Sequence, residues 1–131
     1  MIGLDTNVLL RYLTGDDPVQ SVKAARLIEG SLSPGNPGFV STVVVAEIAW
    51  VLRRTFRRPE LETASVIERL IATDSIIVER ESCVAEALAR TMEDRAPFTD
   101  GLIAALGRNA GCSHTVTFDR KALRLPGFAP V

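Results

Sequence analysis

Four acidic residues stand at places in the sequence where a binding or catalytic site could form. Asp5 directly follows the short apolar segment MIGL, and Asp119 directly follows the strand-like segment HTVTF. Asp100 lies in the first turn of an expected helix, and Glu47 lies inside the otherwise apolar stretch FVSTVVVAEIAWVL. An unpaired carboxylate is costly to bury. The four residues together therefore point to a ligand that carries positive charge.

The helix that carries Glu47 is expected to have Thr42 as its N-cap. The helical spacing of its apolar residues predicts one buried stripe, made by Val44, Ile48 and Val51. Glu47 then falls within or beside this stripe and not on the opposite, solvated face. The alternative is a carboxylate at the edge of the stripe, paired with Arg53 or Arg54.

The three aspartates also have structural explanations. Asp5 is compatible with a simple turn, and Asp119 with a turn that includes the two basic residues after it. Asp100 is compatible with a role at the N-terminus of its helix, where negative charge is favourable. At this point both explanations stay open for each residue.

A shared site for the four acids has a definite chemistry. Clustered carboxylates repel one another, and a divalent cation supplies the missing positive charge. Oxygen ligands without His or Cys select hard cations, here Mg²⁺ or Mn²⁺. Metal-assisted hydrolysis of a phosphoester is the reaction that such a site favours.

The elements that must position these acids alternate along the chain. Short strands are expected at residues 1–4, 39–41, 75–79 and 114–118, with a last extended piece at 127–131, and helices lie between them. This order predicts a single α/β domain over residues 1–131, a three-layer α/β/α sandwich with a mainly parallel sheet of about five strands. Ligands bind at the carboxyl ends of the strands in such sheets, which is where Asp5 and Asp119 fall.

The composition further limits the kinds of protein and of site that the sequence can form. The 131 residues are 47% apolar and carry a formal net charge of -1, which excludes a bulk polycation and argues against disorder. The only cysteines, Cys83 and Cys112, are expected to be reduced core residues. With His114 as the only histidine, a zinc site or a Ser-His-Asp triad is poorly supported. No signal peptide or membrane-length apolar segment is recognisable, so a soluble, cytoplasmic protein without membrane contact is expected.

Four segments in order, MIGLDTNVLLRYL, VSTVVVAEIAWVL, FTDGLIAALGRNAGC and TVTFDRKA, resemble the PIN-domain ribonucleases. Within that family the resemblance is to the VapC-type toxins of bacterial toxin–antitoxin pairs. It implies a Mg²⁺- or Mn²⁺-dependent endoribonuclease that forms a homodimer and is inhibited by a cognate antitoxin protein. The acids that it implies as metal-binding and catalytic are Asp5, Glu47, Asp100 and Asp119.

The resemblance extends to supporting residues, with one departure. It implies supporting contacts from Asn7, two positions after the first acid, and from Thr117, two positions before the last. Many relatives carry a further Asp three residues before the third acid, where this chain has Pro97. A second metal site is therefore expected to be weak, and a one-metal mechanism stays open.

Basic residues near these motifs are candidates for contacts with RNA phosphates, with a solvated basic surface as the alternative. The candidates are Arg11, Arg53, Arg54, Arg57, Arg58, Arg120 and Lys121. No aromatic platform for stacking single-stranded bases is recognisable in the sequence.

Other functions fit the sequence less well. An aspartate-nucleophile phosphatase requires a second Asp at the position where this chain has Asn7. A receiver-like signalling module requires an Asp at the end of the third strand, where this chain has Glu79. Two alternatives remain within the PIN family. One is a nuclease of RNA processing outside any toxin–antitoxin system, and the other is a metal-binding interaction module with weak or no catalysis.

Overall fold

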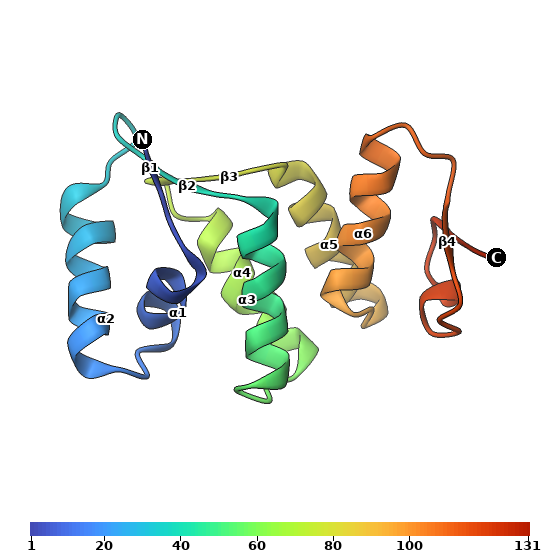
Figure 1. Ribbon diagram of the computed structural model, residues 1–131, viewed down its shortest axis with the longest axis horizontal. Coiled ribbons are helices and arrows are strands. Elements are labelled where there is room, and N and C mark those ends of the chain that lie inside the picture. Colours follow the sequence, from blue (N-terminus) through green and yellow to red (C-terminus); the bar gives the residue numbers. More distant parts are fainter.

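The structure is a computed structural model that describes residues 1–131 (Figure 1). Its first half contains β1 (Ile2–Gly3), α1 (Thr6–Thr14), α2 (Pro18–Ala25), a π-helical turn (Arg26–Ser31), β2 (Gly38–Val40), α3 (Thr42–Arg54) and α4 (Glu60–Ile71). Its second half contains β3 (Ile76–Val78), α5 (Glu81–Asp94), α6 (Phe98–Asn109), β4 (Thr115–Thr117), a 3₁₀ turn (Ala122–Arg124) and β5 (Phe128–Pro130). No helix is both long and apolar enough to cross a membrane.

All five expected strands form, and every pairing between them is parallel, but they make two sheets. One sheet has the order β1-β2-β3, with Ile2 beside Gly38. The other pairs β4 with β5, with Thr115 beside Phe128. The prediction of one sheet of about five strands is therefore not met in this arrangement. With only two residues, β1 offers few hydrogen bonds to a further strand, and its outer edge stays unpaired.

The two sheets lie at different places along the molecule (Figure 1). The three-stranded sheet runs above α1 to α4, whereas β4 lies beyond α6, on the side away from β1. The N- and C-termini accordingly lie toward opposite ends of the long axis. This separation decides how the acids at the strand ends are placed.

The core runs through all the longer helices, and its largest fully buried side chains include Phe98, Leu9, Ile48 and Ile67. The buried face of α3 is rotated about the helix axis relative to the stripe expected from the sequence. Its fully buried residues are Val45, Ile48, Ala49 and Leu52, whereas Val44 and Val51 are only partly buried. Its N-cap is Ser41, whose side chain accepts a hydrogen bond from the Val44 N–H at 3.3 Å, so the expected cap at Thr42 is one residue late.

Two helix ends are set by local signals in the sequence. Asp17 caps α2 by accepting a hydrogen bond from the Gln20 N–H at 3.0 Å, with Pro18 in the first turn. Gly15 ends α1 in the left-handed conformation, with φ at 65°. The expectation for the cysteines was half right, because Cys83 is buried and Cys112 is exposed.

Helices α5 and α6 cross very closely, and Gly101 makes this possible. A Cβ atom at Gly101 would lie 3.3 Å from the Ala87 Cα and 3.4 Å from the Ala87 Cβ. Gly101 is buried and directly follows Asp100, so this contact fixes the start of α6 against α5. The position of the third acid therefore depends on a helix crossing.

Candidate active site

Asp5 and Glu47 are brought to the same place by Thr6. Asp5 is the N-cap residue of α1 and follows β1 directly, but its side chain makes no capping hydrogen bond. The buried Thr6 donates its hydroxyl hydrogen bond to Glu47 Oε2 on α3. This bond ties the carboxyl end of β1 to the middle of α3, and it leaves the Asp5 carboxylate free and exposed beside it.

Glu47 itself is exposed, which corrects the expectation that it lies within or beside the buried stripe. The residues around it explain the difference. Because the buried face of α3 is formed by Val45, Ile48 and Leu52, position 47 points away from the core. There it lines a groove of about 680 Å³ between α3 and α6, together with Trp50. Solvent and the Thr6 hydroxyl stabilise the carboxylate.

Asp100 and Asp119 form the second group of acids. Asp100 lies in the first turn of α6 and is half-buried. Burial raises the pKa of Asp100, and the negative charges of Asp119 and Glu60 raise it further. Asp100 therefore takes up a proton more readily than an ordinary aspartate, and a nearby cation would reverse that tendency.

Asp119 is held by local hydrogen bonds in the turn after β4. Its carboxylate Oδ1 accepts from the Lys121 N–H at 2.8 Å, and its own N–H donates to Thr117 Oγ1 at 3.0 Å. The turn considered from the sequence is thus present. Thr117 contacts the last acid directly, as a residue that supports its position.

The four acids stand as two pairs and not as one cluster. No group of three or more His, Cys, Asp or Glu side chains lies close enough to hold a metal ion. The cause is the division of the sheet. Asp5 follows β1 and Asp119 follows β4, and these strands do not pair with each other. The strand ends that a continuous sheet would bring to one edge are therefore apart.

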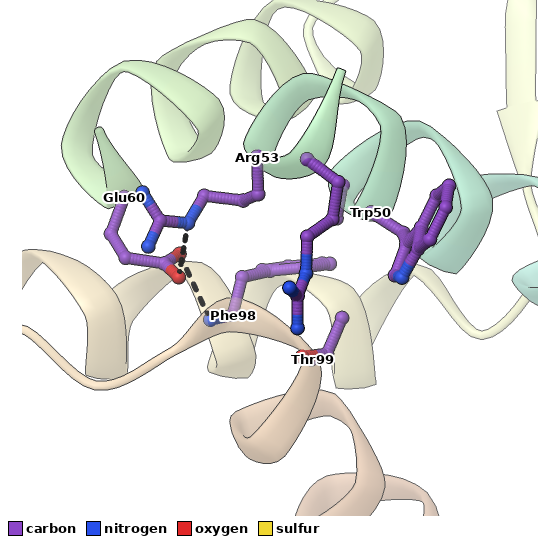
Figure 2. A pocket seen from close by; sticks show the side chains of 7 residues that line it. Trp50, Arg53, Glu60, Phe98 and Thr99 are labelled. Carbon is purple, nitrogen blue, oxygen red and sulfur yellow. Dashed lines mark hydrogen bonds and ion pairs between the residues drawn. The ribbon is translucent and has the colours of Figure 1, made fainter. Parts of the chain in front are cut away.

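The other candidate residues differ in their surroundings. Asn7 is exposed and lines a groove between α1 and α2. Arg11 is paired with Asp16 at 2.8 Å, and Arg53 with Glu60 at 2.8 Å (Figure 2). The remaining basic candidates have no acidic partner and stay available to phosphate: Arg54, Arg57, Arg58, Arg120 and Lys121.

The roles of two residues in this region were not predicted from the sequence. Glu79, at the end of β3, accepts hydrogen bonds from the Thr42 N–H at 2.7 Å and the Thr42 hydroxyl at 2.9 Å, which fixes the start of α3. The Trp50 side chain is 58% exposed, although it lies in a helix that looked apolar. The exposure of Trp50 can be predicted from its spacing relative to the buried residues only once it is known which face of α3 is buried.

Comparison with known proteins identifies the family. The PIN domain family matches residues 2–127, which is nearly the whole chain. No curated protein matches the sequence significantly. PIN domains have a three-layer α/β/α fold, are in general nucleases, and generally use divalent metal ions. The family match confirms the fold class expected from the alternation of strands and helices. The chain therefore belongs to the PIN domain family.

Proposed function

We propose that this protein is a Mg²⁺- or Mn²⁺-dependent endoribonuclease that acts as the toxin of a toxin–antitoxin pair. The proposed metal-binding and catalytic residues are Asp5, Glu47, Asp100 and Asp119. The proposal rests on membership of a nuclease family and on the types of side chain found at the strand ends.

The observation that carries the proposal is that none of these four carboxylates has a basic partner. The ion pairs of the chain use other acids, namely Asp16, Glu60, Glu86 and Asp94. The chain has 15 Lys and Arg residues, so neutralising partners are not scarce. Carboxylates that stay unpaired beside one another fit a site meant for a cation from solution.

The donor set agrees with a hard divalent cation. All four side chains offer only oxygen, which Mg²⁺ and Mn²⁺ prefer. When bound, such an ion neutralises negative charge on the carboxylates and on the scissile phosphate. Binding by all four requires the β4–β5 sheet to approach β1, since the two pairs are separate in the structure described here.

The chain's own residues orient the acids. Thr6 donates its hydroxyl hydrogen bond to Glu47, which leaves the second oxygen of that carboxylate available. The Lys121 N–H fixes one oxygen of Asp119 in the same way. Burial and the charges of Asp119 and Glu60 raise the pKa of Asp100, and a cation bound there would favour its charged form.

The test is cleavage of structured RNA by the purified protein, first with Mg²⁺ or Mn²⁺ and then with EDTA. We expect metal-dependent cleavage that Asp5→Asn lowers by about 100-fold or more, because the variant replaces an anionic carboxylate ligand with a neutral amide. Asp74→Asn is the matched control, since Asp74 is exposed and lies in the turn before β3. Cleavage that persists in EDTA, or that is equal in Asp5→Asn, overturns the assignment.

The toxin role implies two protein partners, a second copy of the chain and a cognate antitoxin. An apolar groove of about 360 Å³ between α4 and α5 supports such a contact, with Leu88 and the exposed Met92 in its lining. Induced expression should arrest growth, and co-expression of the neighbouring small reading frame should restore it. Growth that continues despite RNA cleavage in vitro would remove the toxin role and leave the nuclease.

A further inference from the structure

A cavity of about 400 Å³ opens where the last turns of α3 meet the first turns of α4 and α6 (Figure 2). Its lining is Ala49, Trp50, Arg53, Arg54, Glu60, Phe98 and Thr99. In Figure 2, Trp50 stands at one side and the Arg53–Glu60 pair at the other, with Thr99 below them. Thr99 directly precedes Asp100, so the cavity adjoins the second pair of acids.

One wall of the cavity is fixed by its own contacts. Arg53 Nε lies 2.8 Å from Glu60 Oε1, and Arg53 Nη1 donates to the Arg58 carbonyl oxygen at 2.8 Å. Glu60 Oε2 also accepts from the Phe98 N–H at 3.4 Å. These bonds join the three helices and use the charges of both Arg53 and Glu60. The positive charge of Arg53 in this wall is therefore paired with the negative charge of Glu60.

Arg54 is the free cation of the cavity. Its guanidinium is exposed and has no hydrogen-bond or ion-pair partner. The neighbouring Thr99 is half-buried, and its hydroxyl also has no hydrogen-bond partner. A guanidinium has five donors in a planar fork, a geometry that matches phosphate. The cavity thus combines one unpaired positive charge with one unused hydroxyl.

Trp50 adds an exposed aromatic surface to the same place. It precedes Arg54 by four positions on α3, so both side chains lie on one face of the helix. Its side chain is 58% exposed, whereas the aromatic ring of Phe98 in the same cavity is almost fully buried. An exposed indole beside an unpaired guanidinium is the pairing that binds single-stranded nucleic acid through stacking and phosphate contact.

We propose that this cavity binds one nucleotide of a single-stranded RNA segment. The base stacks on the indole of Trp50, and the adjacent phosphate binds Arg54, with the Thr99 hydroxyl as a further donor. The inference rests on the proposed function, because it gives the RNA substrate a second anchoring point next to Asp100. An acidic peptide would use Arg54 but would gain little from the face of the indole, which is why RNA is the chosen occupant.

The chain's single tryptophan makes the test specific, since all tryptophan fluorescence comes from Trp50. Asp5→Asn protein in EDTA is titrated with a single-stranded RNA hexamer and, separately, with an abasic strand of equal charge. We expect the hexamer to quench the fluorescence and the abasic strand to leave it nearly unchanged. Quenching by an oligo-glutamate peptide but not by RNA overturns the proposal and assigns the cavity to a protein ligand.

Variants separate stacking from charge, with binding followed by anisotropy of a labelled hexamer. Trp50→Ala should weaken binding about 5- to 100-fold, and Trp50→Phe should be intermediate, because a smaller ring still stacks. Arg54→Gln should lower the slope of log affinity against log salt by about 0.7. Arg26→Gln, an exposed arginine on the π-helical turn, is the control. If Trp50→Phe and Trp50→Ala both bind the hexamer as tightly as the parent protein does, the proposed subsite is overturned.

The outcomes distinguish this subsite from the nuclease. Metal-dependent cleavage without quenching of Trp50 removes the subsite alone. Quenching by the hexamer in a protein that cleaves no RNA removes the nuclease function and leaves an RNA-binding cavity. Melting curves of both Trp50 variants check that the fold is intact, which is expected because the side chain is mostly exposed.

Discussion

At the scale of single residues, acids near the strand ends fall into two groups with different tasks. Glu79 is committed to structure, because it accepts two hydrogen bonds from Thr42. Asp5 makes no capping bond, and Glu47 accepts only the hydroxyl of Thr6. A free carboxylate at a strand end is therefore a better indicator of function than the mere presence of an acid there.

The task of Glu79 predicts how stability depends on pH. The Thr42 N–H and hydroxyl hold the pKa of Glu79 below its ordinary value of 4.5. A lowered pKa in the folded state gives stability that is present above pH 4.5 and is lost as the pH falls through the folded value. Glu79→Gln should accordingly melt at a lower temperature than the parent at pH 7. The difference should shrink below pH 4.5.

Melting temperatures of both proteins across pH 3 to 7 check this, with Glu62→Gln on the exposed side of α4 as control. A gap between Glu79→Gln and the parent that stays constant down to the lowest pH would show that the Thr42 contacts do not depend on the charge. Equal melting temperatures of Glu79→Gln and the parent at pH 7 would remove the assignment of Glu79 as the residue that fixes the start of α3.

At the scale of helices and strands, the crossing of α5 and α6 positions the third acid. Gly101→Ala adds a Cβ that would lie 3.3 Å from the Ala87 backbone, so the two helices must move apart. We expect a loss of about 1–3 kcal/mol in the free energy of unfolding. Urea denaturation measures this loss, and Gly30→Ala, where an added Cβ meets nothing within 4 Å, is the control.

The same variant tests the link from packing to function. Because Gly101 adjoins Asp100, a displaced α6 should also lower RNA cleavage under conditions where the variant is fully folded. If Gly101→Ala has normal stability and normal cleavage, the crossing of α5 and α6 can accommodate the added Cβ and does not position Asp100.

Elements whose signals are local could be predicted from the sequence. Asp17 and Pro18 start α2, and Gly15 ends α1, because capping and left-handed backbone depend on neighbouring residues only. Which face of α3 is buried could not be predicted from the sequence. Val43 to Val45 are all apolar, and only packing selects which of them is buried. The exposure of Trp50 was missed for the same reason, because it depends on which face is buried.

The candidate site shows the same division. Its residue types and their places at strand ends are readable from the sequence, as is the turn formed by Asp119. Their distances in space are not, because they depend on whether strands from opposite ends of the chain pair. In the structure, β1 pairs with β2, and β4 pairs with β5.

At the scale of the whole molecule, the outer edges of β1 and β4 are both unpaired. The amides of Ile2 and Leu4 donate to the β2 side, at 3.0 Å and 2.8 Å, so the intervening Gly3 amide points to the open edge. Thr115 donates to Gly127 at 2.7 Å, so the amide of Val116 likewise points outward. Unpaired edges of this kind are suited to pairing with another strand.

Hydrogen exchange at these two amides tests whether the edges join when the site is loaded. We expect Gly3 and Val116 to exchange fast in EDTA and to become protected when Mn²⁺ and an uncleavable RNA analogue are added. The amide of Thr115, already bonded to Gly127, should stay protected in both states. Fast exchange of Gly3 and Val116 in both conditions would mean that the sheets stay separate during binding.

The most direct test of a shared metal site is calorimetric titration of Mn²⁺ into Asp5→Asn and Asp119→Asn, since these acids follow strands of different sheets. If all four carboxylates bind one cation, each variant lowers the affinity by about 10- to 100-fold, while Asp74→Asn binds like the parent. Mn²⁺ binding that is unchanged in either Asp5→Asn or Asp119→Asn would contradict a common site.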